Sequence, residues 1–195
     1  DGYHFTVFKS DQNDRQTLSS NFIQTICEDK EGFLWIGTDG GGINRFDKSQ
    51  HAFKRYDFGE TNRFVIAIAE DEKGFIWFGT NNGNLNRLDK KTGVIQKFGS
   101  QLETNSIQSI FKDSKGNLWI GTANGLFLFD YEKRTFKGYK KKSGKKSLAD
   151  DFVWSITEDK DCSLWIGTNN GLSKMIFNGE EYLFENYFHS GDKNF

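Results

Sequence analysis

Short apolar runs alternate along the chain with polar turns rich in Gly, Asn and Asp. The first run of each group ends in Glu-Asp or Lys-Asp, as in FIQTICED at residues 22–29. It is followed by a run around a Trp, then by a run of mixed polar and apolar residues, and last by an aromatic run. Runs this short, joined by hairpin-type turns, predict antiparallel strands and leave no room for a helix. In the first group we expect strands near residues 22–28, 33–38, 43–47 and 52–57.

The same group of runs then recurs. Nearly identical ten-residue phrases appear four times, from GFLWIGTDGG at Gly32 to CSLWIGTNNG at Cys162. A repeat of about 40–45 residues that holds four antiparallel strands is typical of a β-propeller blade. The four repeated tryptophans, spaced by 42, 42 and 46 residues, are Trp35, Trp77, Trp119 and Trp165.

The predicted fold is therefore an all-β β-propeller segment of four four-stranded antiparallel blades. Residues 4–8 resemble the outer strand of a blade, so we expect a stray N-terminal strand that belongs to a preceding blade. The tail after Phe188 is interpreted as a linker, and the segment as cut from a larger, seven-bladed propeller. The expected divisions are an outer strand and linker in 1–20, and one blade each in 21–62, 63–104, 105–150 and 151–195.

Both faces of the Trp strand are apolar. Side chains alternate between faces along a strand, so Leu34 and Ile36 share one face while Trp35 and Gly37 share the other. Apolar residues on both faces indicate a strand covered on both sides by neighbouring blades. We interpret the tryptophans as packing residues rather than ligand contacts, because the repeat explains all four. The glycine of each copy is expected to leave space for a bulky neighbour: Gly37, Gly79, Gly121 and Gly167.

The stretch from Glu28 to Asp47 follows the pattern ED-x-x-G-x-L-W-I-G-T-x-x-G-G-L-x-R-F-D. This pattern resembles the two-component regulator propeller repeat, in four copies and a partial one that cover nearly the whole chain. The fourth copy departs from it, with Cys162 in place of the turn Gly and LSKMIFN in place of the Arg-Phe-Asp run. The WD40 signatures Gly-His and Trp-Asp are missing, and the period excludes kelch repeats.

The resemblance implies a function as well as a fold. It implies the extracytoplasmic, periplasmic part of an inner-membrane hybrid two-component histidine kinase, which senses an oligosaccharide and often dimerises. The kinase itself would lie elsewhere in the parent protein. Two alternatives stay open: a non-catalytic protein-interaction or structural propeller, and a propeller enzyme such as a lyase or glycosidase.

Composition argues against several partners. The 26 Lys and Arg almost balance the 27 Asp and Glu, so no global field favours nucleic acid. No apolar run approaches the roughly 18 residues that span a bilayer, so we expect no membrane contact within this segment. Partners are instead expected to be the oligosaccharide and neighbouring blades, from the same parent chain or from a homo-oligomer.

Catalytic chemistry is sparse. His4, His51 and His189 lack metal-ligand spacing, and no nucleophile or phosphate-loop motif occurs. We therefore expect no catalytic residue, metal or cofactor in the segment. The Glu-Asp pairs precede tight turns and are interpreted as turn residues. The Lys-rich run 137–147 is interpreted as a solvated loop, with a patch for an anionic sugar or phosphate as the alternative.

Ligand contacts are sought where the repeat varies. The first strand of each copy has one freely varying position, occupied by Gln24, Ile66, Gln108 and Trp154. Interblade loops and hairpin tips are expected at the same rim. Planar amides, carboxylates and an aromatic face suit a sugar. Trp154 either stacks on such a sugar or fills a gap in the atypical fourth copy. The candidate ligand-binding residues are Trp154, Gln24, Gln108, Arg63, Asn21, Asn105, Asp151, Asn82 and Asn170.

Overall fold

The computed structural model describes residues 5–59, 63–98, 101–104, 106–143 and 146–188. Its strands form four antiparallel sheets of four strands each, which confirms the predicted all-β propeller segment. No α-helix occurs in this described part of the chain. Nor does any helix there have the length and apolarity needed to cross a membrane.

Each sheet is a meander in which consecutive strands pair. The first blade consists of β1 (Ile23–Glu28), β2 (Leu34–Thr38), β3 (Gly42–Asp47) and β4 (Ala52–Tyr56). The second consists of β5 (Val65–Glu70), β6 (Ile76–Thr80), β7 (Leu85–Leu88) and β8 (Ile95–Lys97). The third consists of β9 (Ile107–Lys112), β10 (Leu118–Thr122), β11 (Gly125–Asp130) and β12 (Thr135–Tyr139). The fourth consists of β13 (Val153–Glu158), β14 (Leu164–Thr168), β15 (Gly171–Phe177) and β16 (Tyr182–Tyr187).

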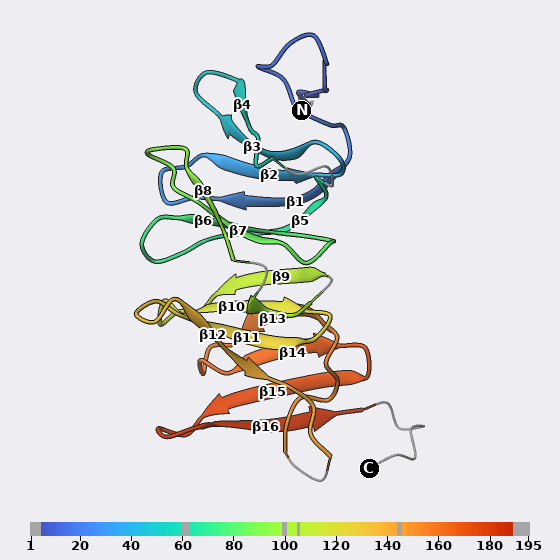
Figure 1. The fold of residues 1–195 in the computed structure, drawn as a ribbon, viewed down its shortest axis with the longest axis vertical. Coiled ribbons are helices and arrows are strands. Elements are labelled where there is room, and N and C mark those ends of the chain that lie inside the picture. Colours follow the sequence, from blue (N-terminus) through green and yellow to red (C-terminus); the bar gives the residue numbers. More distant parts are fainter. Residues whose placement is uncertain (1–4, 60–62, 99–100, 105, 144–145, 189–195) are drawn as a thin grey trace, which may run out of the picture.

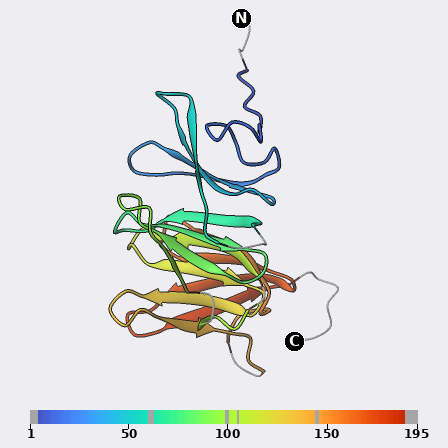
Figure 2. The ribbon, with the colours of Figure 1, turned by 45° about the horizontal axis from the view of Figure 1, so that its top comes forward.

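The blades stack in chain order, with the first and the last at opposite ends of the stack (Figure 1). The inner strands β1, β5, β9 and β13 lie next to one another in that order. The view in Figure 2 likewise leaves the first blade at one end. The four blades therefore form an open stack, with three junctions between consecutive blades.

Each of these junctions is built around a tryptophan. Trp35 packs in one apolar cluster with Val65 and Phe78 of the second blade. Trp77 and Trp119 pack in the same way against the third and fourth blades, and all three indoles are completely buried. Aromatic side chains bury the largest apolar areas, so these rings supply much of the interblade contact.

The glycine two residues after each Trp gives the following blade room. A Cβ on Gly79 would lie 2.2 Å from Cγ2 of Ile107, at the start of the third blade. A Cβ on Gly37 would lie 2.7 Å from the carbonyl oxygen of Val65. Gly167 differs, because among the described residues only Ser155 of its own blade has atoms near its Cβ position. Close approach of the next inner strand therefore depends on glycine in the first three blades.

The predicted strand over residues 4–8 is not formed. Residue 4 lies outside the described residues, and residues 5–9 belong to no sheet. The ring of Phe8 instead lies 4.8 Å from that of Phe46 and 5.5 Å from that of Phe53. Phe8 therefore packs on the first blade, whereas Phe5 and Val7 are 90% and 72% exposed.

Candidate functional site

Every inner strand has a β-bulge at the same place. In β1 the pairing with β2 passes from Ile23↔Thr38 to Thr25↔Gly37, so Gln24 has no partner in the ladder. The other three inner strands skip one residue at the equivalent position: Ile66, Gln108 and Trp154. A bulge leaves its extra residue unpaired and redirects its side chain. The four freely varying positions of the repeat are therefore the four bulge residues.

Hydrogen bonds hold the hairpin tips beside the starts of the inner strands. The backbone N–H of Asn169 donates to the carbonyl of Phe152 at 3.1 Å, and the backbone N–H of Asn81 donates to the carbonyl of Phe64 at 3.2 Å. Neighbouring blades are tied together at the same level, where the Gly125 amide donates to the carbonyl of Asp151 at 2.7 Å. The bulges, strand entries and hairpin tips thus follow one rim of the stack, which we call the bulge rim.

Trp154 is the largest bulge side chain and is half exposed, at 50%. Its indole Nε1 donates to Oδ1 of Asn169 at 2.6 Å, and its ring centroid lies 4.5 Å from that of Phe152. The indole is therefore oriented by its own blade and is not sealed between blades. Asn169, the neighbour of the candidate Asn170, is the tip residue that holds it.

Several other candidates make hydrogen bonds within the fold. Gln108 donates its amide to Oγ of Ser106 at 2.7 Å, and Gln24 is exposed. Arg63 pairs with Asp57 at 3.3 Å. Three more accept hydrogen bonds from elsewhere in the chain: Asn21 from the Ser10 amide, Asp151 from the Lys141 amide, and Asn82 from the Thr80 hydroxyl. Asn170 is exposed and donates its backbone amide to Oγ1 of Thr168 at 3.3 Å. Asn105 lies outside the described residues.

The acidic turns hold the tryptophans in place. The carboxylate of Asp29 accepts hydrogen bonds from the backbone amides of Glu31 and Phe33, both at 3.0 Å. Its other oxygen accepts the indole N–H of Trp35 at 2.8 Å. Asp71, Asp113 and Asp159 bind their own tryptophans at 2.7–2.9 Å. The turn role was expected, whereas the bond to the indole was missed; the constant six-residue spacing from Asp to Trp was its signal.

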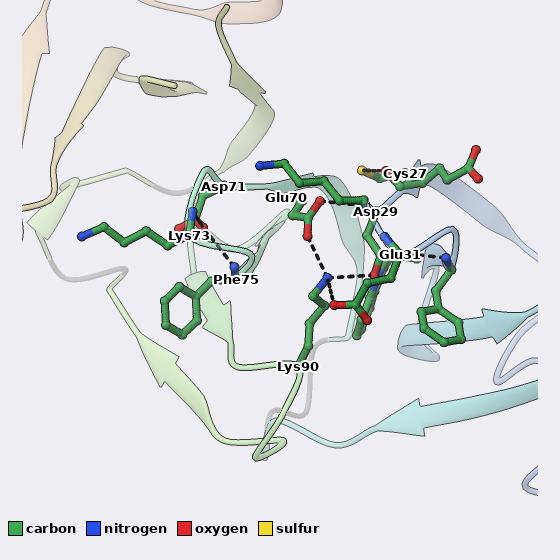
Figure 3. A network of polar contacts seen from close by, with 12 residues as sticks. Cys27, Asp29, Glu31, Glu70, Asp71, Lys73, Phe75 and Lys90 are labelled. Carbon is green, nitrogen blue, oxygen red and sulfur yellow. Dashed lines mark hydrogen bonds and ion pairs between the residues drawn. The ribbon is translucent and has the colours of Figure 1, made fainter. Parts of the chain in front are cut away.

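A buried lysine joins the first two blades at these turns (Figure 3). Nζ of Lys90 lies 2.7 Å from Glu70, 3.2 Å from Asp29 and 3.2 Å from Glu31. The side chain of Lys90 is 9% exposed and that of Asp29 is completely buried. Buried charges are expensive unless they are paired, and here one ammonium faces three carboxylates from two blades.

The ion pairing of Lys90 with Asp29 shifts the pKa values of both groups. Burial alone would raise the pKa of Asp29, but hydrogen bonds from Trp35, the Phe33 amide and Lys90 hold it below its ordinary value. Burial would likewise lower the pKa of Lys90, but its bonds to Glu70, Asp29 and Glu31 raise it. The adjoining cleft of about 490 Å³ is lined by four lysines and four carboxylates, so its charges balance.

Neither a metal site nor a disulfide is seen in the described part of the chain. No three His, Cys, Asp or Glu side chains are grouped there as metal ligands. Cys27 and Cys162 are both free thiols. Burial raises the pKa of Cys27 above its ordinary value, and so disfavours the thiolate.

A comparison with known protein families identifies the repeats that carry this geometry. Four segments match the family described as two component regulator propeller: residues 17–40, 59–82, 101–124 and 147–170. Each of the four contains a bulge, the acidic turn and the Trp strand. The chain belongs to the two component regulator propeller family.

Solved structures of extracellular domains from two component systems also resemble this chain. The extracellular domain of BT3049, assigned as a hybrid two component system of B. thetaiotaomicron, is 26% identical over 95% of this chain with a TM-score of 0.80. That of BT4673 from B. thetaiotaomicron is 28% identical over 82% of the chain with a TM-score of 0.69. This chain spans only 24% and 22% of those two structures.

More distant propellers share the fold alone. Virginiamycin B lyase from Staphylococcus aureus is 20% identical over 84% of this chain and 55% of its own, with a TM-score of 0.65. Such a likeness transfers no chemistry. No significant match was found among curated proteins.

Proposed function

We propose that this two component regulator propeller chain is a ligand-sensing segment of a hybrid two component system. The segment lies in the periplasm as part of an inner-membrane protein whose histidine kinase is elsewhere in the parent chain. Family membership and the match to extracellular domains over 95% of the chain support this assignment. The segment itself binds the ligand or transmits the signal of its binding, and it catalyses no reaction.

The ligand in this proposal is an oligosaccharide bound at the bulge rim. The observation that carries the proposal is the half-exposed indole of Trp154, fixed by Asn169 on a bulge that the fold does not require to be Trp. Because its N–H is already bonded, the ring offers an apolar face for stacking on a sugar. Amides such as Gln24 and Gln108 occupy the equivalent bulges of other blades and can bond hydroxyl groups.

A binding titration with a panel of neutral and acidic oligosaccharides tests the proposal on the full-length sensor domain. Trp154→Ala should weaken the ligand about fivefold or more, since aromatic stacking contributes about 1 kcal/mol. Its melting temperature should hardly change, because half of the ring is already in water.

Phe177→Ala is the matched control, because this ring is 44% exposed and ends β15 at the rim opposite the bulges. It should bind the ligand as the natural chain does. A destabilisation of several kcal/mol by Trp154→Ala, or equal losses of binding in both variants, would refute a binding role for Trp154.

A second candidate function, a protein-interaction propeller, is favoured by apolar side chains at the two ends of the stack. Ile26 is 59% exposed on the first blade, while Leu172 and Tyr187 are 38% and 49% exposed on the last. Light scattering of the 195-residue chain at increasing concentration tests this candidate. Self-association would support it, whereas a strictly monomeric chain would count against these faces as interaction surfaces.

A further inference from the structure

The outer strands of the third and fourth blades enclose a cleft rich in lysine. Its volume is about 380 Å³, and Tyr139 of β12 together with Tyr182 and Phe184 of β16 line it with aromatic side chains. Four lysines from β12 and the following loop surround these rings: Lys137, Lys140, Lys142 and Lys146. We call it the lysine cleft.

Positive charge in the lysine cleft is largely unbalanced. Among the described residues that line it, Glu181 is the only acidic one, against four lysines. In the described part of the chain no carboxylate lies within ion-pair distance of Lys137, Lys142 or Lys146. The cleft at the first junction also has four lysines but matches them with four carboxylates. The lysine cleft therefore attracts a negative charge that the described residues do not provide.

Only the ring of Tyr139 is available to a ligand in the lysine cleft. The Tyr139 hydroxyl is buried and makes no hydrogen bond. Burial raises the pKa of Tyr139 to about 12, so the hydroxyl keeps its proton at neutral pH. A buried donor without an acceptor is costly, but a ligand in the open cleft cannot reach this hydroxyl, because its oxygen has almost no exposed surface.

The backbone that presents the lysines is anchored to the fourth blade. The Lys141 amide donates to Oδ1 of Asp151 at 2.6 Å, and the Lys142 amide to Oγ of Ser147 at 2.8 Å. Asn186 of β16 donates to the Ser147 carbonyl at 2.9 Å. These bonds hold the described part of the loop against the blade, so less ordering is needed when a ligand binds.

We propose that the lysine cleft binds an anionic saccharide, with ammonium groups on its carboxylates or sulfates and aromatic rings against its sugar faces. The volume suits a small ligand, and a wall of aromatic rings suits a sugar better than an inorganic ion. A membrane surface or a nucleic acid would require a broader basic face, while this chain has a net charge of −1. The proposal is independent of the bulge rim and Trp154.

Calorimetric titration of the 195-residue chain tests the proposal with three hexasaccharides: polygalacturonate, a sulfated glycan and a neutral galactan. We expect at least one acidic hexasaccharide to bind ten times or more tighter than the neutral one, with affinity falling as salt rises. The stronger of the two acidic arms identifies the anionic group. Failure of both to bind at millimolar concentration, or equal binding of the neutral galactan, would overturn the proposal.

The double variant Lys142→Gln/Lys146→Gln should weaken the acidic hexasaccharide at least tenfold. Lys115→Gln/Lys160→Gln removes the same charge from two exposed lysines outside the cleft and should change affinity less than twofold. Tyr139→Phe, which removes only the buried hydroxyl and keeps the ring, should leave binding nearly unchanged. Equal losses in the two double variants would reveal non-specific charge attraction and refute the site. Trp154→Ala should leave this binding unchanged, which separates the result from that of the bulge rim.

Discussion

Trp119 and Trp165 occupy the same place in consecutive repeats, within the same phrase Leu-Trp-Ile-Gly-Thr. Both indoles donate to the turn aspartate of their own blade, at 2.9 and 2.8 Å. Trp119 is nevertheless completely buried beneath the fourth blade. Trp165 is partly exposed and stacks on Tyr187, with 5.6 Å between the ring centroids. The local hydrogen bonds of a repeat residue are thus encoded within its blade, but its burial depends on the neighbouring blade.

The largest expected effect comes from removing these two rings. Trp119→Ala should lower the free energy of unfolding by about 3–5 kcal/mol, because it leaves a cavity between the third and fourth blades. Trp165→Ala should cost less than half as much, since part of its ring is already in water. Urea denaturation of both variants measures the difference. Equal losses would mean that burial by the next blade adds little to the contribution of the indole.

Equivalent lysines make the next comparison. Lys90 and Lys48 both follow the aspartate at the end of a third strand, but Lys90 is buried between blades and Lys48 makes an exposed pair with Glu28 at 2.6 Å. Lys90→Met should cost about 3 kcal/mol, because it leaves buried carboxylates without their cation. Lys48→Met should cost at most about 1 kcal/mol. Chemical denaturation at pH 7 compares the two, and similar costs would show that the buried network contributes no more than a surface pair.

A glycine pair tests the space between blades. Gly79→Ala would place a methyl group against Ile107 of the following blade and should cost about 2 kcal/mol through overpacking. At Gly167 the new methyl meets only the Ser155 side chain, which can rotate away, so Gly167→Ala should cost much less. Differential scanning calorimetry of both variants measures the contrast. A stable Gly79→Ala protein would mean that the second and third blades can move apart.

Lowering the pH should reduce the contribution of Lys90 to the free energy of unfolding. The lowered pKa of Asp29 stabilises the fold above the unfolded value of about 3.9, and this contribution is lost as the pH falls through the folded pKa. The raised pKa of Lys90 has the opposite sense, with stabilisation present below about 10.4 and lost at higher pH. The cost of Lys90→Met should therefore shrink by about 1 kcal/mol between pH 7 and pH 3. Denaturation curves at both pH values test this, with Lys48→Met as the control whose cost should stay nearly constant.

Much of the blade could be predicted from the sequence. The repeat length, the alternation of apolar residues and the Asp-x-x-Gly turns together predicted the strands of each meander, because these signals act between residues close in the chain. The turn role of Asp29 belongs with them, since its backbone hydrogen bonds lie within four residues. Sequence variation also identified Gln24, Ile66, Gln108 and Trp154 as distinct, although it did not predict that they are bulges.

The arrangement between strands and blades was decided by the tertiary structure. A bulge becomes visible only once the register of the paired strand is known. Lys90 meets Asp29 across 61 residues, and Tyr139 meets Tyr182 from the next blade, so neither cluster follows from local spacing. Residues 5–9 have the composition of a strand but pair with no sheet. Hydrogen bonding within a turn is local and can be inferred from the residues themselves, whereas burial, ion pairing and clefts require surfaces that distant segments bring together.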